Sequence, residues 1–150
     1  MSDAFRTILI AYGSLSAGFT WQSIRTSSLP SSAPERLVAE LRLAQMAALL
    51  LTLAAGAYIG FAVVRENQPG VGLDIALAVG FLVAAGFTML REPRQALTII
   101  AVAFAAHAIL HVAHRPGLLP DTLAPRWYSV TGAIYDVYIG ALCYWPILRR

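Results

Sequence analysis

Four apolar runs, each long enough to cross a lipid bilayer, constrain this chain more than any motif in it. They cover residues 37–64, 71–90, 95–114 and 127–145. A helix rises about 1.5 Å per residue, so about 20 apolar residues cross the hydrocarbon core of a membrane. Backbone N–H and C=O groups in lipid must be satisfied within the segment, which makes each run a helix. The sequence therefore predicts an all-α fold, a polytopic transmembrane helical bundle with four spans.

The composition indicates that residues 1–150 form a single membrane domain. Hydrophobic residues make up 58% of the 150 residues and charged residues only 13%, against about 25% charged residues in soluble domains. The net charge of +3 comes wholly from arginine. Because no arginine cluster is interleaved with aromatic residues, we expect membrane lipid and no nucleic acid as a partner. Cys143 is the single cysteine, which excludes an internal disulfide and a Cys-x2-Cys metal motif.

The first 35 residues leave the number of spans open between four and five. Residues 8–24 are moderately apolar but are interrupted by small and polar residues, namely Gly13, Ser14, Ser16, Gly18 and Gln22. Small residues let membrane helices approach closely, which favours a short fifth span. An interfacial helix and a secretory signal are the alternatives, and the acidic Asp3 argues against the signal. Residues 27–34, rich in serine and proline, predict a linker.

Arginine residues gather at one end of the expected spans. That end carries Arg25, Arg36, Arg42, Arg91, Arg94, Arg149 and Arg150, and the other end carries Arg65, Arg115 and Arg126. Because the cytoplasmic side of a membrane protein is enriched in basic residues, the richer end is expected in the cytoplasm. The sequence thus predicts a multi-pass protein of the inner (plasma) membrane with a cytoplasmic C-terminus.

Three histidines place ionisable side chains on one face of the third run. His107, His111 and His114 stand at positions i, i+4 and i+7, which lie within about 40° of one another on a helix. Ionisable groups at membrane depth are costly and usually face the interior of a bundle. His107 lies deepest, whereas His114, next to Arg115, is typical of an interfacial residue. The face is therefore the candidate functional site, with His107 as its principal member.

Two aspartates on the neighbouring runs can meet these histidines. From the rise of about 1.5 Å per residue, Asp136 lies about 14 Å and His107 about 10 Å from the same membrane surface. Asp136 also belongs to a stripe of small and polar residues that favours packing against a helix: Ser129, Gly132, Asp136, Gly140 and Cys143. Asp74 lies only about 5 Å deep, level with His111 and His114. We expect a site of His107, His111 and Asp136, with Asp74 and His114 at its rim.

Imidazole and carboxylate groups in this arrangement suit a divalent transition metal, Zn²⁺, Fe²⁺ or Mn²⁺. His107 and His111, one turn apart, can chelate one ion, with Asp136 as a third ligand or as the carboxylate that orients a ring. A metal-bound water could then attack an ester or amide. A metal-free hydrogen bond between His107 and Asp136 is one alternative. A haem or pigment held by one histidine, or shared with another subunit, is the other.

Three further patterns concern packing. Glu40, which lies between Arg36 and Arg42, predicts an ion pair at the membrane interface. The segment Gly56-Ala57-Tyr58-Ile59-Gly60 is a small-x3-small motif, typical of close packing within a bundle, in a homo-oligomer or against a partner membrane subunit. The two ends of the last run predict an interfacial aromatic belt of Trp127, Tyr128, Tyr144 and Trp145.

The sequence resembles a family of uncharacterised bacterial integral-membrane proteins in three places: Arg91-Glu92-Pro93-Arg94, the histidines from His107 to His114, and Asp136. In that family an Arg-Glu-Pro loop and a late helix with a His-x3-Asp-x2-His pattern precede a final helix that bears an aspartate. His111 stands where the family has its aspartate, and the resemblance covers at most the last third of the chain. It implies a site at His107, His114 and Asp136, and no particular reaction.

Three functions are compatible with this sequence. The first is a metal-dependent enzyme acting on a lipid or another apolar substrate. The second is a small accessory or assembly subunit of a larger membrane complex, with or without a haem or pigment. The third, a small proton or metal transporter, is disfavoured because the chain has no internal repeat and no proline-broken span.

Overall fold

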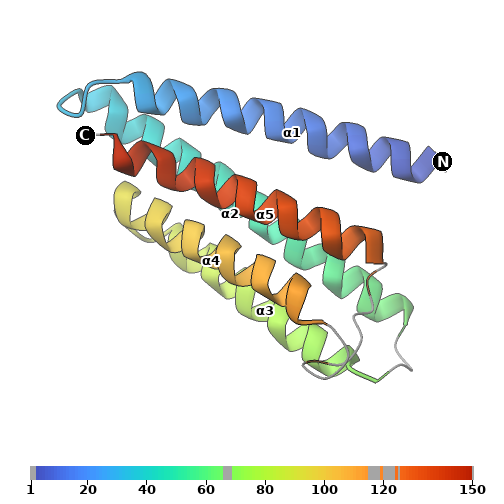
Figure 1. Ribbon diagram of the computed structural model, residues 1–150. Helices are drawn as coiled ribbons and strands as arrows, with labels where there is room; N and C mark the ends of the chain where they lie inside the picture. The colour runs from blue at the N-terminus through green and yellow to red at the C-terminus, as the bar shows by residue number, and fades with distance from the viewer. Residues whose placement is uncertain (1–2, 66–68, 115–118, 120–123, 125, 150) are drawn as a thin grey trace.

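The computed structural model describes residues 3–65, 69–114, 119, 124 and 126–149. This part of the chain forms helices and no strands (Figure 1): α1 (Asp3–Ser28), α2 (Pro34–Val64), α3 (Val71–Thr88), α4 (Pro93–Ala113) and α5 (Arg126–Leu148). The all-α bundle predicted from the sequence is therefore confirmed.

The helix boundaries follow residues that begin a helix readily or adopt special backbone conformations. Pro34 and Pro93 occupy the first turns of α2 and α4, where the fixed φ of proline is favourable and its missing N–H is not needed. Gly70, which precedes α3, has a φ of 95°, a left-handed conformation that glycine adopts without strain. The four expected spans match α2 to α5 to within three residues at each end.

Three of the helices, α2, α3 and α4, are long and apolar enough to cross a membrane. Among the described residues, α5 does not reach this apolarity, because tyrosines, tryptophans and Asp136 take places that aliphatic residues fill in the other three. The three apolar helices expose large hydrophobic side chains on their outer faces, as expected of helices surrounded by lipid. Among these side chains are Leu49, Leu53, Val63, Val83, Val102 and Ile109. α5, predicted as the fourth span, is thus a 23-residue helix of mixed character.

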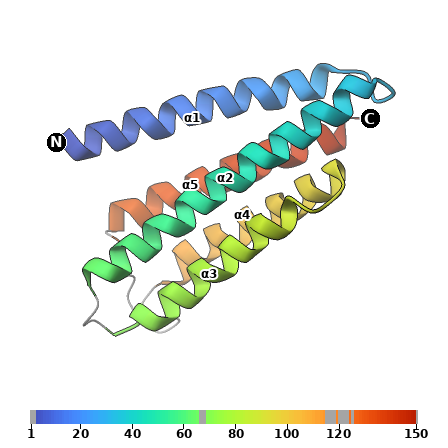
Figure 2. The same cartoon turned by 180° about the vertical axis from the view of Figure 1, so that it is seen from behind.

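The helices form three layers (Figures 1 and 2). α2 and α5 lie in the middle, α1 covers one side, and α3 and α4 cover the other. In the described part of the chain, α1 contacts α5 and α2 but neither α3 nor α4. The C-terminal end of α5 lies at the same end of the bundle as the short connections α1–α2 and α3–α4, and the N-terminus lies at the opposite end. α1 and α5 consequently run in the same direction.

The core lies where α4 meets α5 and α2. Its largest fully buried aliphatic and aromatic side chains on these helices are Leu43, Leu51, Leu97, Ile100, Phe104 and Ile139. α4 and α5 approach closely at Gly140, where an added Cβ would lie 3.3 Å from the carbonyl oxygen of Ala101. Ser129, Asp136 and Cys143 are also buried, so the small and polar stripe of α5 packs inward as predicted. This packing places Asp136 between the helices.

α1 is fixed to α5 at a defect in the α5 backbone. Pro146 lies inside α5 and lacks the N–H that would otherwise bond the carbonyl of Leu142. The hydroxyl of Ser23, a fully buried residue of α1, donates to this Leu142 oxygen at 2.7 Å instead. The hydroxyls of Thr20 and Tyr138 make a second hydrogen bond between the two helices. Residues 8–24 thus lie within a 26-residue helix packed along α5, and their predicted role as a fifth span stays a prediction.

Arg36 joins three segments at the end of the bundle that holds the C-terminal end of α5. Its guanidinium donates to Glu40 Oε1 at 2.9 Å and to the carbonyl oxygens of Leu29, Pro146 and Arg149 at 2.7, 2.7 and 2.6 Å. The ion pair expected at Glu40 is therefore present, but it is buried, because Arg36 and Glu40 are only 4% and 2% exposed. The last carbonyls of a helix lack helical partners, and the buried guanidinium binds that of Pro146 in α5 and that of Arg149 just after the helix.

The small-x3-small motif of α2 faces open space. An added Cβ at Gly56 or Gly60 would meet no atom within 4 Å in the described part of the chain. The motif therefore does not serve packing between these helices. Its use in a homo-oligomer or against a partner membrane subunit stays a prediction.

Ser23→Ala removes the donor to the carbonyl that Pro146 leaves without a helical partner. We expect the variant to lower the free energy of unfolding in detergent by about 1 kcal/mol, measured as a lower midpoint of thermal unfolding. Ser28→Ala is the matched control, because the exposed hydroxyl of Ser28 bonds the Arg25 carbonyl within its own helix. Equal midpoints for the two variants would contradict this role of Ser23.

Candidate metal centre

His107 of α4 and Asp136 of α5 face each other between the two helices. They are 3% and 1% exposed, and His107 Nδ1 lies 2.6 Å from Asp136 Oδ2. α4 and α5 run in opposite directions and pack along their lengths, which brings residues of equal depth together. The Phe81 ring of α3 packs edge-on against the His107 imidazole, with 4.7 Å between the ring centroids. The pairing that helix depth predicts between His107 and Asp136 is thus present.

His111 is held through both of its ring nitrogens. Its Nε2 lies 3.4 Å from Asp136 Oδ2, and its Nδ1 lies 2.7 Å from the hydroxyl oxygen of Tyr58 on α2. Gly132 of α5 makes room for the ring, since an added Cβ there would lie only 2.5 Å from His111 Nε2. Three helices, α2, α4 and α5, therefore fix the orientation of this imidazole.

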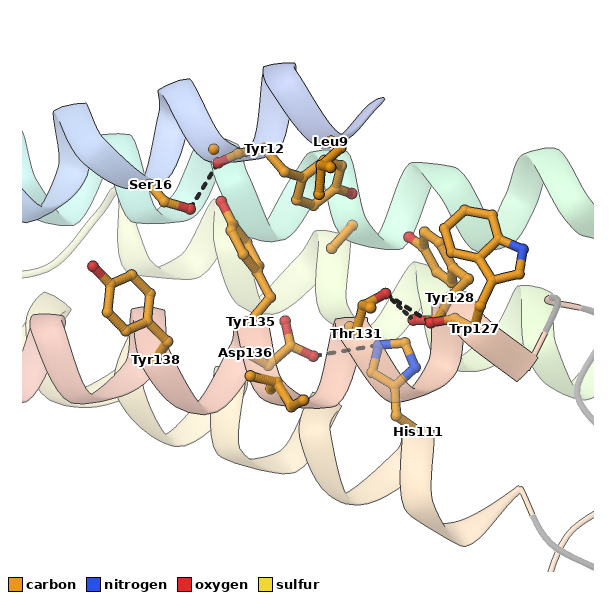
Figure 3. A pocket seen from close by; sticks show the side chains of 14 residues that line it. Leu9, Tyr12, Ser16, His111, Trp127, Tyr128, Thr131, Tyr135, Asp136 and Tyr138 are labelled. Atoms are coloured by element: carbon orange, nitrogen blue, oxygen red, sulfur yellow. Dashed lines mark hydrogen bonds and ion pairs between the residues drawn. The ribbon is translucent and has the colours of Figure 1, made fainter. Parts of the chain in front are cut away.

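His107, His111, Asp136 and Tyr58 form one connected cluster of buried polar contacts. A carboxylate only accepts hydrogen bonds, so His107 Nδ1 donates to Asp136 Oδ2. His111 Nε2 lies within ion-pair distance of the same oxygen. Figure 3 shows the pair of His111 and Asp136 below α1. His111 Nδ1 then accepts the hydroxyl proton of Tyr58. When both imidazoles are neutral, the cluster carries one buried negative charge, which a cation can neutralise.

The geometry is compatible with one metal ion. Single ligand atoms of His107, His111 and Asp136 lie within 4.8 Å of one another. Tetrahedral zinc with bonds of about 2.0–2.1 Å places its ligand atoms about 3.4 Å apart, the separation between His111 Nε2 and Asp136 Oδ2. The 2.6 Å between His107 Nδ1 and Asp136 is a hydrogen-bond length. An ion would lengthen it by roughly 0.8 Å, or bind the other nitrogen of His107 while Asp136 orients the ring.

A cavity of about 360 Å³ lies between α1 and α5 and reaches this cluster. His111 and Asp136 form part of its wall (Figure 3). Most of the remaining wall is apolar or aromatic: Leu9, Tyr12, Trp127, Tyr128, Ile134, Tyr135 and Tyr138. Gly13 of α1 contributes empty space, because an added Cβ there would meet nothing within 4 Å. An apolar molecule can therefore approach the cluster from the side of α1.

The two residues expected at the rim of the site pair with each other. His114 Nε2 lies 3.5 Å from Asp74 Oδ1, and both side chains are 3% exposed. Among the described residues, only His107, His111 and Asp136 form a group that could hold a metal ion. His111 thus occupies the place beside His107 and Asp136 that the family resemblance implied for His114. The side chain of His114 is buried against α3 rather than displayed at the membrane interface.

Tyr58 has a role in the cluster that the sequence did not predict. The sequence indicated Tyr58 only as a member of the small-x3-small motif. Its ring centroid lies 5.7 and 5.4 Å from those of His107 and His111. The available signal was a single phenol on an otherwise apolar face of its helix. Tyr128 was expected in an aromatic belt at the membrane interface. It is instead 8% exposed and packs against Tyr58 and Phe61.

No protein-family model, no curated protein and no solved structure matches this chain. The resemblance to the bacterial membrane family stays a prediction. The assignment of the site rests on the geometry of the described residues.

Gly132→Ala places a methyl group on His111. We expect displacement of the imidazole and a loss of about 1–3 kcal/mol of unfolding free energy, the usual effect of overpacking. Thermal unfolding in detergent measures the loss. Gly60→Ala is the matched control, because a Cβ there meets no atom within 4 Å and should leave the midpoint unchanged or raise it. A Gly132→Ala protein as stable as the control would show that His111 does not occupy this position.

Proposed function

We propose that this protein is a membrane-embedded, metal-dependent hydrolase that cleaves an ester or amide bond in a lipid-phase substrate. The observation that carries the proposal is that two residues of the group of His107, His111 and Asp136, namely His111 and Asp136, lie in the wall of a mainly apolar cavity. A metal-binding group and an apolar binding space thus share one wall. Neither feature alone distinguishes an enzyme from a structural site.

The donor set favours Zn²⁺, Fe²⁺ or Mn²⁺. Two imidazole nitrogens and one carboxylate oxygen are ligands that each of these ions accepts. Three protein ligands leave at least one coordination position for water, the usual difference between catalytic and structural zinc sites. His111 and Asp136 both line the cavity, so the remaining position is expected on the cavity side. Tyr58 supports the site by holding the orientation of His111.

Activation of water is the chemistry that such an ion supplies. In the proposed reaction the water oxygen bonds to the acyl carbon, and the bond from that carbon to the leaving oxygen or nitrogen breaks. One water proton passes to the second carboxylate oxygen of Asp136 and from there to the leaving group, giving a carboxylic acid and an alcohol or amine. Figure 3 shows this second oxygen on the side of the cavity where Tyr135 lies.

The cavity wall favours an uncharged ester or amide over a phosphodiester. No arginine lines the cavity in the described part of the chain, so a phosphate group would lack the partner it usually has in proteins. The hydroxyls of Ser16 and Thr131 donate to carbonyl oxygens of their own helices. The wall therefore offers apolar contact along most of its surface, which suits an acyl chain.

Metal content tests the centre directly. We expect purified wild-type protein to hold about one equivalent of a transition metal, as a three-ligand site does, measured by mass spectrometry of the dissolved metal. His107→Ala, His111→Ala and Asp136→Asn should each abolish retention, and Tyr58→Phe should weaken metal affinity about 10-fold. His114→Ala is the matched histidine control and should weaken affinity least. A wild-type protein with less than about 0.2 equivalents after gentle purification and metal addition would refute the centre.

Hydrolysis of esters with short and long acyl chains tests the substrate class. In metal-loaded protein reconstituted in lipid nanodiscs, we expect Gly13→Leu to reduce kcat/KM for a long-chain ester about 10-fold or more, because the new side chain fills the cavity. Metal content should not change, since Gly13 touches no ligand. Asp136→Asn should remove hydrolysis of both esters. Long-chain hydrolysis that is unaffected by Gly13→Leu would place the substrate elsewhere.

A further inference from the structure

The buried pair of Asp74 and His114 is not used by the proposed hydrolytic centre. Asp74 lies in the first turn of α3 and His114 follows the last turn of α4. Both side chains are 3% exposed, and 3.5 Å separates Asp74 Oδ1 from His114 Nε2. This distance is at the limit for a hydrogen bond, so the two groups are close without forming a tight pair.

One carboxylate oxygen of Asp74 is buried without a hydrogen-bond donor. Asp74 Oδ2 has no partner among the described residues. A buried carboxylate oxygen that lacks a donor or a cation costs free energy, because it has given up water and gained nothing in exchange. Among the described residues, this oxygen is therefore a position where a donor or a cation could bind.

A small cavity is lined both by Asp74 and by His107, one residue of the candidate metal centre. Its polar wall consists of Asp74 and His114 at one end and of His107 and Tyr58 nearer the centre. The remaining wall is made by apolar residues, Leu77, Ala78, Phe81 and Leu110. Its volume of about 10 Å³ holds about one water molecule or one small ion.

We propose that Asp74 and His114 form a loading site that takes up the divalent metal ion and passes it to His107. The proposal rests on the metal centre proposed above. A carboxylate oxygen and an imidazole nitrogen are acceptable ligands for such an ion, but two protein ligands hold it less firmly than three. The ion would therefore leave the pair for the three ligands His107, His111 and Asp136, of which His107 lines the same small cavity.

The location of the larger cavity supports separate routes for metal and substrate. That cavity lies on the opposite side of the cluster, between α1 and α5, and its wall is mainly apolar. A hydrated cation gains little from such a wall and loses its water there, which is costly at membrane depth. The metal would reach the centre along α3 and α4, and the apolar substrate along α1 and α5.

The rate of Co²⁺ uptake by the metal-free full-length protein in detergent tests the loading site. Co²⁺ bound by nitrogen and oxygen ligands absorbs visible light, so uptake and equilibrium affinity are both measurable. We expect Asp74→Asn and His114→Gln to slow uptake about 10-fold or more, because the local negative charge and the first ligands are lost. Equilibrium affinity should change less than about 3-fold, since the final ligands remain.

Two other variants make the experiment specific. Glu92→Gln removes the same charge from an exposed carboxylate that precedes α4, whereas His114 follows the other end of that helix, and should leave uptake unchanged. Gly13→Leu narrows the larger cavity and should also leave uptake unchanged. Uptake at the wild-type rate in both Asp74→Asn and His114→Gln would overturn the loading site. Slower uptake in Gly13→Leu would overturn it as well, because the ion would then enter between α1 and α5.

Equilibrium binding separates this proposal from the one on which it rests. A wild-type protein that binds no Co²⁺ at equilibrium refutes the metal centre, and the loading site with it. Normal equilibrium binding with unchanged uptake rates in the Asp74 and His114 variants refutes the loading site alone. An equal loss of rate and affinity in these variants would make Asp74 and His114 permanent ligands, which also contradicts the proposal.

Discussion

One carboxylate buried in an apolar bundle, Asp136, is the constraint on which the other polar contacts of this half of the protein depend. A carboxylate at this depth is stable only with donors or a cation around it. His107 donates to Asp136, and His111 Nε2 lies 3.4 Å from the same oxygen. The second nitrogen of His111 in turn takes the hydroxyl of Tyr58. Gly132 has to lack a side chain so that the imidazole can reach the carboxylate. The chemistry of one residue on α5 thus determines residue types on α2 and α4.

At the opposite end of the bundle, polar contacts specify how the helices fit together. In lipid the hydrophobic effect does little to bring helices together, so close packing and hydrogen bonds between helices carry more of the specificity. Pro146 leaves the Leu142 carbonyl of α5 without its helical hydrogen bond, and the hydroxyl of Ser23 on α1 donates to this carbonyl instead. Arg36 of α2 satisfies the carbonyls that follow. The ends of α1, α2 and α5 are therefore tied at one place, while α1 leaves space beside α5 farther along, at the larger cavity.

Much of the fold and the centre of the site could be predicted from the sequence because both follow from length and periodicity. Apolar runs of bilayer length predict the helices, and equal depth on antiparallel neighbours predicts the contact of His107 with Asp136. Tyr58 could not be found in this way, because its contact depends on the rotation of α2 about its own axis, which an almost uniformly apolar helix does not encode. The burial of Arg36 could not be predicted from the sequence for a different reason. Its partners are backbone carbonyls, which every residue has, so no pattern of side chains indicates them.

The contacts of Arg36 also bear on the order of events during synthesis of this protein. The carbonyl groups that it binds belong to residues 110 and 113 positions later in the chain. When α2 leaves the ribosome, its guanidinium has Glu40 as a partner but lacks the acceptors on α5. α2 must then hold a partly unsatisfied arginine near the membrane surface while α3 and α4 are made. These two contacts of α2 can therefore form only after α5 has been made.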